Sequence, residues 1–310
     1  MSGPPRHGEA DAMATNDARA WVVQPDAGAL RAVPSAPRLS TASCEPLREI
    51  AALDEQGERR LLQVPVERPL TLCIEGRELV TLMTLGAAPE LLVLGYLLDQ
   101  RLIADVTAIE SVTVDWAVGT AAVTMRSALR GAGAGHTASR RGDVAGMACA
   151  LGTAFGDVMR QGDAASLAES AAARISRDML FDVLETMRRY DAIHRAAGSV
   201  HSCALFRGAR LWASIEDVSR HNGMDTIAGW MALHGIRGGD KILFTTGRLT
   251  GEMVMKAAHN GIPIMVSRNG VTAMGHDLAA KLGMTLFGRA ANRRFTCYVG
   301  AERFDAGPAP

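Results

Sequence analysis

Residues 240–267, DKILFTTGRLTGEMVMKAAHNGIPIMVS, decide the fold predicted for this chain. DKILFTTG predicts a buried strand, and LTGEMVMKAAHNG predicts a helix that ends at Gly261, a natural C′ position. PIMVS predicts the next buried strand. A helix between two strands is typical of a right-handed crossover, which places the strands parallel in one sheet.

The same alternation of strand and helix continues on both sides of this stretch. Upstream, GSVHSCALF and ARLWASIE predict strands and NGMDTIAGWMALHGI predicts a helix. Downstream, VTAMGHDLAAKLG predicts a helix, and MTLFGR and RFTCYVG predict the closing strands. We therefore expect a largely parallel, helix-covered sheet in this half, and for the whole chain an α/β fold whose mixed, partly parallel sheet carries helices on both faces.

The N-terminal half predicts a smaller α/β domain. Alternating apolar residues before the turn Glu75-Gly76-Arg77 indicate a hairpin, APELLVLGYLLDQRLI indicates a buried helix, and AIESVTVDWAVGTAAVTM indicates two more strands. Another helix is predicted to open at Ser176, because apolar residues follow at helical spacing. The predicted divisions are a disordered Pro/Ala-rich tail at 1–58, an N-terminal domain at 59–125, a mobile Gly/Arg-rich loop at 126–152, a C-terminal domain at 153–302 and a tail at 303–310.

Composition excludes several classes of protein. The chain has 310 residues, 48% of them hydrophobic, and a formal net charge of zero, which argues against a nucleic-acid surface. The longest apolar run, LLVLGYLL at 91–98, is too short to span a membrane, and no secretory signal is evident. Five scattered cysteines without CxxC spacing indicate a reducing cytoplasm, with neither a disulfide framework nor a zinc site.

Polar residues gather where three consecutive strands are predicted to end. In such sheets ligands bind outside the carboxyl ends of the strands, close to helix N-termini. Arginines, hydroxyls and backbone N–H groups at this edge favour an anionic, phosphate-bearing ligand. The residues concerned are Glu216, Asp217, Arg220, His221, Asn222, Gly247, Arg248, Thr250, Glu252, Ser267, Arg268, Asn269, Gly270 and Thr272.

A structural interpretation stays open for each of these residues taken alone. Glu252 and Lys256 have the spacing of a surface helix pair, and Thr250 has the position of a helix cap. His221 and Asn222 fit a turn and an N-cap, and His201 fits a buried, hydrogen-bonded histidine. No HxxxH, CxxC or HxE…PCxxC pattern supports metal-dependent hydrolysis.

Three blocks of this region resemble the FdhD family of sulfur carrier proteins. The blocks are EDVSRHNGMDTIAG, TTGRLTGEMVMKAAHNGIPIMVSRNGVT and LAAKLGMTLFGR…RRFTCYVG. VPVERPLTLCIEGRELVTLMTLGAAPELLVLGYLLDQRLI resembles the opening hairpin and helix of the family. The resemblance runs from about Val64 to Gly300, and the order and spacing of the blocks make it specific.

The resemblance implies a fold and a function. It implies a C-terminal domain similar to the cytidine deaminase fold without its zinc ligands, in a cytoplasmic homodimer. Members accept persulfide sulfur from a cysteine desulfurase and deliver it to the bis-guanine-dinucleotide molybdenum cofactor, which then goes to formate dehydrogenase. The cofactor-facing residues that the resemblance implies are His201, Glu216, Asp217, Arg220, His221, Asn222, Thr246, Gly247, Arg248, Glu252, Lys256, Ser267 and Thr272.

The sulfur-carrying site departs from the family pattern. Family members show a CGxCG stretch, whereas ACALGT here supplies Cys149 and leaves Gly152 at the place of the second cysteine. The segment at 267–272 also lacks the proline common before the threonine. One thiolate suffices to carry a persulfide, while a second cysteine adds a resolving thiol.

Three hypotheses follow for the chain. The first is a sulfurtransferase that carries persulfide on Cys149 and requires no zinc. The second is a non-catalytic chaperone that binds the molybdenum cofactor for a molybdoenzyme, with Cys149 a vestige. The third, a deaminase-like hydrolase, is the least favoured because the ligand motif is missing.

Overall fold

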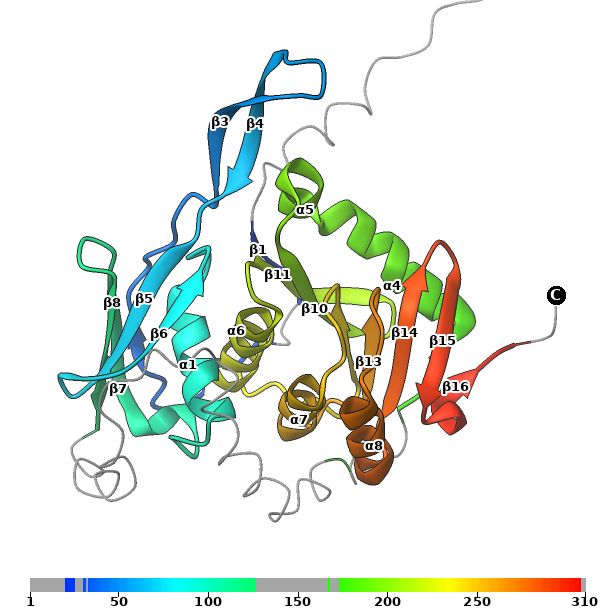
Figure 1. Ribbon diagram of the computed structural model, residues 1–310. Coiled ribbons are helices and arrows are strands. Elements are labelled where there is room, and N and C mark those ends of the chain that lie inside the picture. Colours follow the sequence, from blue (N-terminus) through cyan, green and yellow to red (C-terminus); the bar gives the residue numbers. More distant parts are fainter. Residues whose placement is uncertain (1–19, 26–29, 32, 127–166, 168–172, 308–310) are drawn as a thin grey trace, which may run out of the picture.

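The computed structural model describes residues 20–25, 30–31, 33–126, 167 and 173–307. A seven-stranded sheet forms its centre (Figure 1). The strands follow one another across the sheet in the order β1 (Trp21–Val23), β11 (Arg210–Asp217), β10 (His201–Arg207), β12 (Lys241–Thr245), β13 (Ile264–Ser267), β14 (Thr285–Ala291) and β15 (Arg294–Val299).

The sheet is mixed, as predicted for the whole chain, but it is not largely parallel. Only β12–β13 and β13–β14 pair in parallel, whereas β1–β11, β10–β11, β10–β12 and β14–β15 pair antiparallel. For β10–β11 and β14–β15, the reason lies in the connections. β10 and β11 are joined by a turn with Gly208 at φ 57°, and β14 and β15 by a turn with Asn292 at φ 50°. Such tight turns join only antiparallel neighbours, because a parallel pair needs a crossover of a dozen or more residues.

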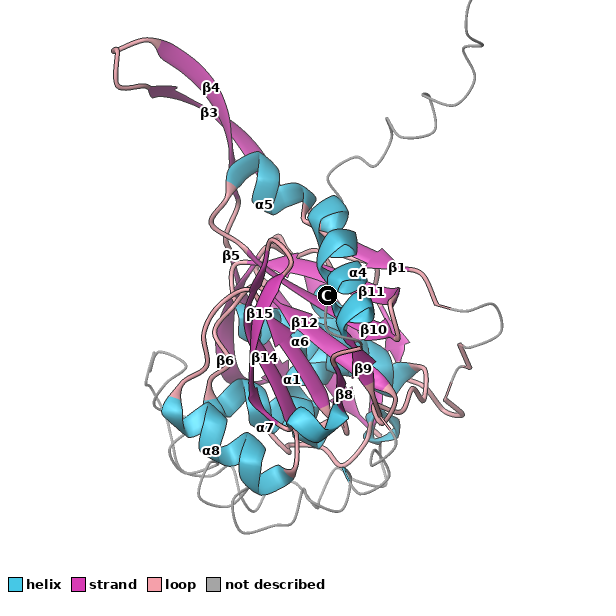
Figure 2. Cartoon of the chain, turned by 90° about the vertical axis from the view of Figure 1, so that its right-hand side faces the viewer, coloured by secondary structure: helices cyan, strands magenta, loops and turns pink. Residues whose placement is uncertain are grey.

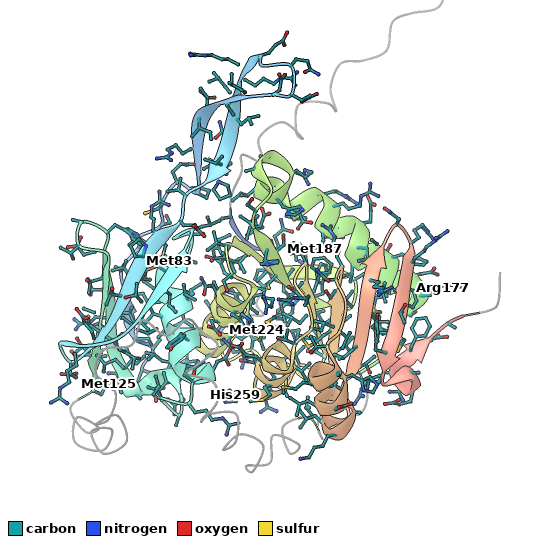
Figure 3. The ribbon with its side chains drawn as sticks, in the orientation of Figure 1. Met83, Met125, Arg177, Met187, Met224 and His259 are labelled. Atoms are coloured by element: carbon teal, nitrogen blue, oxygen red, sulfur yellow. The ribbon has the colours of Figure 1, made fainter. Side chains whose placement is uncertain are left out.

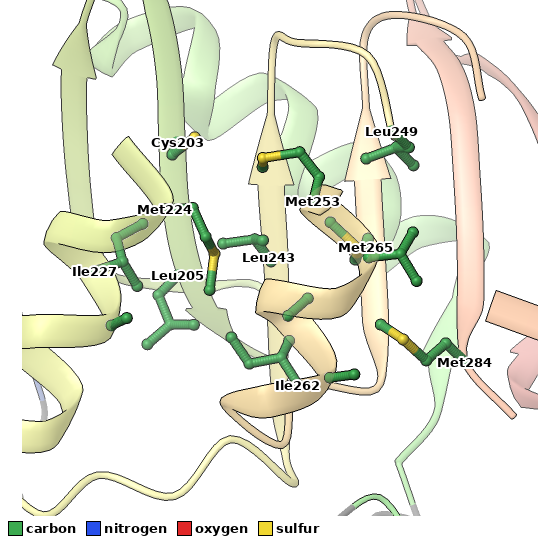
Figure 4. Close-up of a cluster of buried hydrophobic side chains, with 14 of the residues drawn as sticks. Cys203, Leu205, Met224, Ile227, Leu243, Leu249, Met253, Ile262, Met265 and Met284 are labelled. Atoms are coloured by element: carbon green, nitrogen blue, oxygen red, sulfur yellow. The ribbon is translucent and has the colours of Figure 1, made fainter. Parts of the chain in front are cut away.

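Helices cover both faces of this sheet (Figures 1 and 2). Leu243 of β12 packs with α6 (Arg220–Leu233) and α7 (Gly251–His259) in one apolar cluster, which Figure 4 shows in close-up. Its neighbours Ile242 and Phe244 belong to the cluster on the opposite face, with α4 (Arg177–Tyr190). The two-residue period of a strand explains this division. In Figure 3, Met224 and Met187 mark the two faces.

Further short elements complete this half of the chain. Ser176 caps α4 through its side chain, which accepts a hydrogen bond from the backbone N–H of Met179, so the predicted helix start is confirmed. α8 (Ala273–Leu282) lies beside α7, and α5 (Ala192–Ala197) follows α4. The remaining elements are η4 (Ala301–Arg303) and the parallel pair β9 (Ile175–Ser176) and β16 (Phe304–Asp305).

The N-terminal half forms a second, five-stranded sheet packed on one helix, α1 (Pro89–Asp99). The hairpin, the helix and the two following strands are confirmed. The strand order is β2 (Arg38–Leu39), β7 (Ile109–Asp115), β8 (Thr120–Met125), β5 (Arg68–Ile74) and β6 (Arg77–Thr84), with η2 (Val106–Ala108) before β7.

The two halves meet where α1 crosses α6. A Cβ atom added at Gly95 would lie 1.6 Å from the carbonyl oxygen of Asp225, and one added at Gly229 would lie 2.1 Å from the carbonyl oxygen of Leu91. Neither position accommodates a larger side chain without movement of the backbone. The glycines therefore set how closely the N-terminal half docks against the central sheet.

The described strands correct the predicted tails. Residues 21–23 pair with β11, and β3 (Leu47–Leu53) pairs with β4 (Arg59–Pro65) in a ribbon that projects from the body (Figures 1 and 2). The boundary at residue 58 therefore falls inside the β3–β4 ribbon, and β16 falls inside the predicted C-terminal tail. The short strands β1 and β16 are stabilised by pairing with distant segments, β11 and β9, which local composition does not reveal. The predicted loop at 126–152 lies outside the described residues except for Arg126.

None of the described helices combines the length and the apolar composition needed to cross a lipid bilayer. The similarity of the C-terminal domain to the cytidine deaminase fold stays a prediction.

Candidate functional site

The strand ends singled out in the sequence meet at one edge of the central sheet. β10 runs antiparallel to β11 and β12, so its first residue, His201, lies opposite Asp217 at the end of β11. Cys203 of β10 lies opposite Thr245 at the end of β12, and Thr245 lies beside Ser267 at the end of β13. This edge therefore collects three strand ends and one strand start.

Hydroxyl groups shape the turns that leave this edge. Thr246 Oγ1 accepts the backbone N–H of Ser202 at 2.9 Å and lies 3.4 Å from His201 Nδ1. Ser267 Oγ donates to the carbonyl of Gly247 at 2.6 Å, and Thr272 caps α8 by accepting the N–H of Gly275. These hydrogen bonds fix the backbone of the turns, and the predicted cofactor contacts of Thr246, Ser267 and Thr272 stay predictions.

Two buried carboxylates of the predicted set accept hydrogen bonds from the protein itself. Glu216 accepts the backbone N–H groups of Ile193 at 2.9 Å and His194 at 2.8 Å, at the start of α5. Asp217 accepts from Thr84 Oγ1 at 2.6 Å and from the side chain of Asn222 at 2.8 Å. Burial raises the pKa of both carboxyls, against the effect of these hydrogen bonds.

Asn222 and Lys256 are also engaged inside the protein. Asn222 Nδ2 donates to the carbonyl of Met83 at 2.7 Å as well as to Asp217, and so joins α6 to β6 of the N-terminal half. Lys256 Nζ donates to buried Asp225 between α6 and α7. For Glu216, Asp217, Asn222 and Lys256, these contacts favour the structural interpretation that the sequence left open.

His221 and Glu252 lie together where α6 and α7 begin. His221 Nδ1 is 3.1 Å from Glu252 Oε1, and the imidazole is mostly buried. Burial lowers the pKa of His221, and Glu252 opposes this effect. The structure therefore places a carboxylate close to one ring nitrogen beside the strand ends, but the geometry is not that of a hydrogen bond, and Nδ1 is buried without a hydrogen-bond partner among the described residues.

Two arginines add positive charge to the same side of the edge. The side chain of Arg220 covers Gly247, where an added Cβ would lie 2.4 Å from its Cδ. Burial lowers the pKa of Arg220, and the nearby cation of Arg248 lowers it further. Burial likewise lowers the pKa of His201, assisted by both arginines. A neutral imidazole and two crowded guanidinium groups favour an anion.

Thr250 does not act as a side-chain cap of α7. It occupies the N-cap position, but its hydroxyl makes no capping hydrogen bond. Thr250 Oγ1 and Arg220 Nε are buried without a hydrogen-bond partner among the described residues. The alternative that Thr250 serves only as a helix cap is therefore not supported.

A pocket lies on the other side of the same edge, next to α4. It has a volume of about 230 Å³. Arg268 Nη1 lies 2.5 Å from Oδ2 of buried Asp191, which follows α4, and this ion pair holds the arginine in the wall. The residues that line the pocket are Leu184, Arg188, Asp191, His194, Arg195, Arg268, Ala290, Ala291 and Asn292.

The chemistry of this pocket suits an anion. Three arginines, a histidine and one carboxylate line it; Asp191 is paired with Arg268, and the guanidinium of Arg195 donates to the backbone carbonyls of Arg188 and Arg189. Arginine forks match the geometry of phosphate groups. The sequence pointed to Arg268 in this wall but missed Arg188, His194 and Arg195, because only the fold brings the end of α4 to the end of β13. No local motif marks these three residues.

Cys149, the predicted sulfur carrier, lies outside the described residues. Of the described cysteines, Cys203 is fully buried beneath the edge, and burial raises its pKa to about 12. Such a thiol is a poor nucleophile at neutral pH. Among the described side chains, no group of three His, Cys, Asp or Glu residues could hold a metal ion. The prediction of a site without zinc stays a prediction.

Comparison with known proteins agrees with the resemblance in the sequence. The chain is 28% identical over 241 residues to the Bacillus licheniformis protein named sulfur carrier protein FdhD, covering 78% of this chain and 89% of that protein. It is 28% identical over 251 residues to the Bacillus subtilis protein of the same name, covering 80% and 94%.

A solved structure shows the same fold. It is a Desulfotalea psychrophila protein described as a formate dehydrogenase accessory protein, with a TM-score of 0.66 and 23% sequence identity, covering 84% of this chain and 98% of that one. The model of the FdhD/NarQ family matches residues 65–305, which is most of the chain. The protein therefore belongs to the FdhD/NarQ family.

Proposed function

We propose that this protein is a sulfurtransferase that accepts persulfide sulfur from a cysteine desulfurase and delivers it to the bis-guanine-dinucleotide molybdenum cofactor of a formate dehydrogenase. Membership of the FdhD/NarQ family carries this proposal, because the relatives it matches are named sulfur carrier proteins. The solved relative is described as a formate dehydrogenase accessory protein, which supports the choice of target.

The cationic edge of the central sheet supports a phosphate-bearing cargo. The cofactor is a substrate here, and its pyrophosphates need paired donors such as Arg188 and Arg268, while Arg195, whose terminal nitrogens donate to the backbone carbonyls of Arg188 and Arg189, adds positive charge. A pocket of about 230 Å³ has room for one phosphate-bearing part of the dinucleotide rather than the whole molecule. Arg220 and Arg248 offer further cationic groups on the α6 and α7 side of the edge.

Cys149 is the proposed carrier of the sulfur. Its thiolate attacks the terminal sulfur of the desulfurase persulfide, and the donor thiolate leaves with the electron pair of the broken S–S bond. Release to the cofactor requires attack on the carried sulfur by the acceptor, because Gly152 replaces a second thiol. The proposed setting is the cytoplasm, in line with the cysteine usage of the chain. The proposed oligomeric state is a homodimer, which the resemblance to the family implies.

Labelled sulfur tests the proposal. The full chain is incubated with a cysteine desulfurase and ³⁵S-cysteine, and the label is mapped to peptides by mass spectrometry. We expect the label on the peptide that contains Cys149, its loss in Cys149→Ser, and its retention in the control Cys44→Ser, which removes a described free thiol. Absence of the label from Cys149 would contradict the carrier role, and so would full activation of formate dehydrogenase by Cys149→Ser. Either result would favour the chaperone hypothesis.

A further inference from the structure

The β3–β4 ribbon projects from the body of the molecule and exposes apolar side chains (Figures 1 and 2). Three of the eight large apolar side chains that are exposed among the described residues lie on it. Leu53 is 68% exposed, Leu61 67% and Leu62 49%. A two-stranded ribbon is marginally stable in water unless further strands or a helix cover its apolar side chains. The ribbon therefore gains stability from any surface that covers these leucines.

The two most exposed leucines lie on the same face of the ribbon. Ala51 lies opposite Leu61 at the middle of the ribbon, and Leu53 lies opposite Arg59 near its tip. Residues that lie directly opposite one another, and residues two apart on one strand, share a face. These four exposed side chains therefore form one face, which we call the Leu61 face, and Leu62 points to the other side.

The Leu61 face carries one charge of each sign, at equal distances from its middle. Glu49 lies two residues before Ala51, toward the base of the ribbon, and Arg59 lies two residues before Leu61, toward the tip. At the rise of a β-strand, each charge is about 7 Å along the ribbon from the central pair. Both side chains are exposed, and no ion pair joins either of them to another described residue.

This pattern is complementary to itself about a two-fold axis. The axis runs between two ribbons, across the strands at the level of Ala51 and Leu61, so that the tip of one ribbon lies over the base of the other. Leu61 then packs on the partner's Leu61. Glu49 lies across from the partner's Arg59, and Arg59 from the partner's Glu49, so both charges gain an opposite charge.

We propose that the Leu61 face of the β3–β4 ribbon packs on the same face of a second copy of this chain, with the two ribbons antiparallel. The contact has two layers of two strands each, with the leucines between the layers, as in packed β-sheets. The inference rests on the proposed function for the homodimer, adds the surface that forms it, and involves no step of sulfur transfer.

The oligomeric state of the full chain as a function of concentration tests this contact. We expect sedimentation equilibrium to show a wild-type dimer that dissociates on dilution. Leu61→Glu removes a leucine that is buried twice in each dimer and brings two carboxylates together, so the dissociation constant should rise at least about 100-fold. Leu62→Glu is the matched control, because it makes the same change at the next residue, on the other side of the ribbon, and should leave the dissociation constant unchanged.

An exchange of charges distinguishes this contact from any other dimer. Glu49→Arg and Arg59→Glu each place like charges across from one another, so each variant alone should dimerise about 10-fold more weakly than the wild type. In a mixture of the two variants, both positions again hold opposite charges across the axis. The heterodimer should therefore form with about the affinity of the wild type, and native mass spectrometry counts it by the different masses of the two variants.

Three results would overturn the inference. They are a wild type that stays monomeric over the concentration series, a dimer that Leu61→Glu does not weaken, and a mixture without an excess of heterodimer. If the wild type is monomeric and Leu61→Glu loses binding to a cysteine desulfurase, the face receives that protein instead. Persulfide label on Cys149 in a chain that does not dimerise overturns this inference alone, whereas a dimer that gains no label overturns the proposed sulfur transfer alone.

Discussion

Lys256 of α7 donates a hydrogen bond to Asp225 of α6, and both side chains are buried. Glu252, four residues before Lys256 on α7, lies beside His221 of α6. The two α7 side chains therefore pair with residues of α6 and not with each other. Burial lowers the pKa of Lys256, but the carboxyls of Asp225 and Asp99 outweigh it and raise the pKa overall. The lysine thus serves as a buried cation between two helices.

Lys256→Met should destabilise the protein rather than abolish ligand binding directly. Removing one partner of a buried ion pair leaves an uncompensated charge, at a cost of about 3–5 kcal/mol. Chemical denaturation of the full chain measures the change, with Lys281→Met, an exposed lysine of α8, as the control. A variant as stable as the wild type that has lost nucleotide binding would restore the cofactor-facing role expected from the sequence.

Gly95→Ala should weaken the contact between the two halves of the chain. The new Cβ would meet the carbonyl oxygen of Asp225 at 1.6 Å, which only a shift of α1 or α6 relieves. Overpacking typically costs about 1–3 kcal/mol, and a clash with backbone belongs at or above the upper end of this range. Gly270→Ala is the matched control, because no atom lies within 4 Å of its added Cβ. Equal unfolding midpoints for the two variants would contradict the close crossing.

Periodicity in the sequence predicted where helices and strands occur better than it predicted which strands pair and whether they pair parallel or antiparallel. The strands 241–245 and 264–267 and the capped helix at Ser176 were visible as local patterns. The antiparallel pairing of β10 with β12 was not, because it depends on partners far apart in the chain. The same holds for β1, whose three residues gain a strand only by pairing with β11.

In the candidate site, too, local sequence patterns identified residues, whereas contacts between distant segments could not be predicted. The sequence identified the strand ends that gather at the edge, including Arg220, His221 and Arg248. It could not separate side chains that face the edge from those that hold the fold, such as Asp217 with its partner Thr84, 133 residues away. It also missed the pocket next to α4, because Arg188 and Arg268 meet only in three dimensions.

Asp191→Asn should weaken nucleotide binding in the pocket next to α4. The carboxylate orients Arg268 through an ion pair of 2.5 Å, and the amide lacks the charge that holds the guanidinium in the wall. A guanidinium that leaves the wall loses its own charge-assisted hydrogen bond to a phosphate of GDP, which contributes about 1.5–3 kcal/mol, so the affinity for GDP should fall roughly 10-fold to 100-fold. Calorimetric titration of the full chain with GDP measures the change, and Arg268→Gln should reproduce it.

The control for this titration is Arg38→Gln in the N-terminal sheet. It removes one positive charge from an exposed arginine paired with Glu110, far along the chain from the pocket. An equal loss of affinity in this control would show that the net charge of the protein, rather than the pocket, governs binding. Unchanged affinity in Asp191→Asn would show that Arg268 is oriented without the carboxylate.

Asp99→Asn should flatten the dependence of stability on pH. Burial, opposed by Lys256 and reinforced by Asp99, raises the pKa of Asp225 well above 3.8. The folded state then binds more protons than the unfolded state between pH 3.8 and the raised pKa, so the free energy of unfolding falls as pH rises through this window. Without the carboxyl of Asp99, Asp225 ionises more readily against Lys256, and its contribution to that slope shrinks. Urea unfolding of wild type and variant at a series of pH values from about 4 to 8 gives the two slopes, and parallel curves would show that Asp99 does not raise the pKa of Asp225.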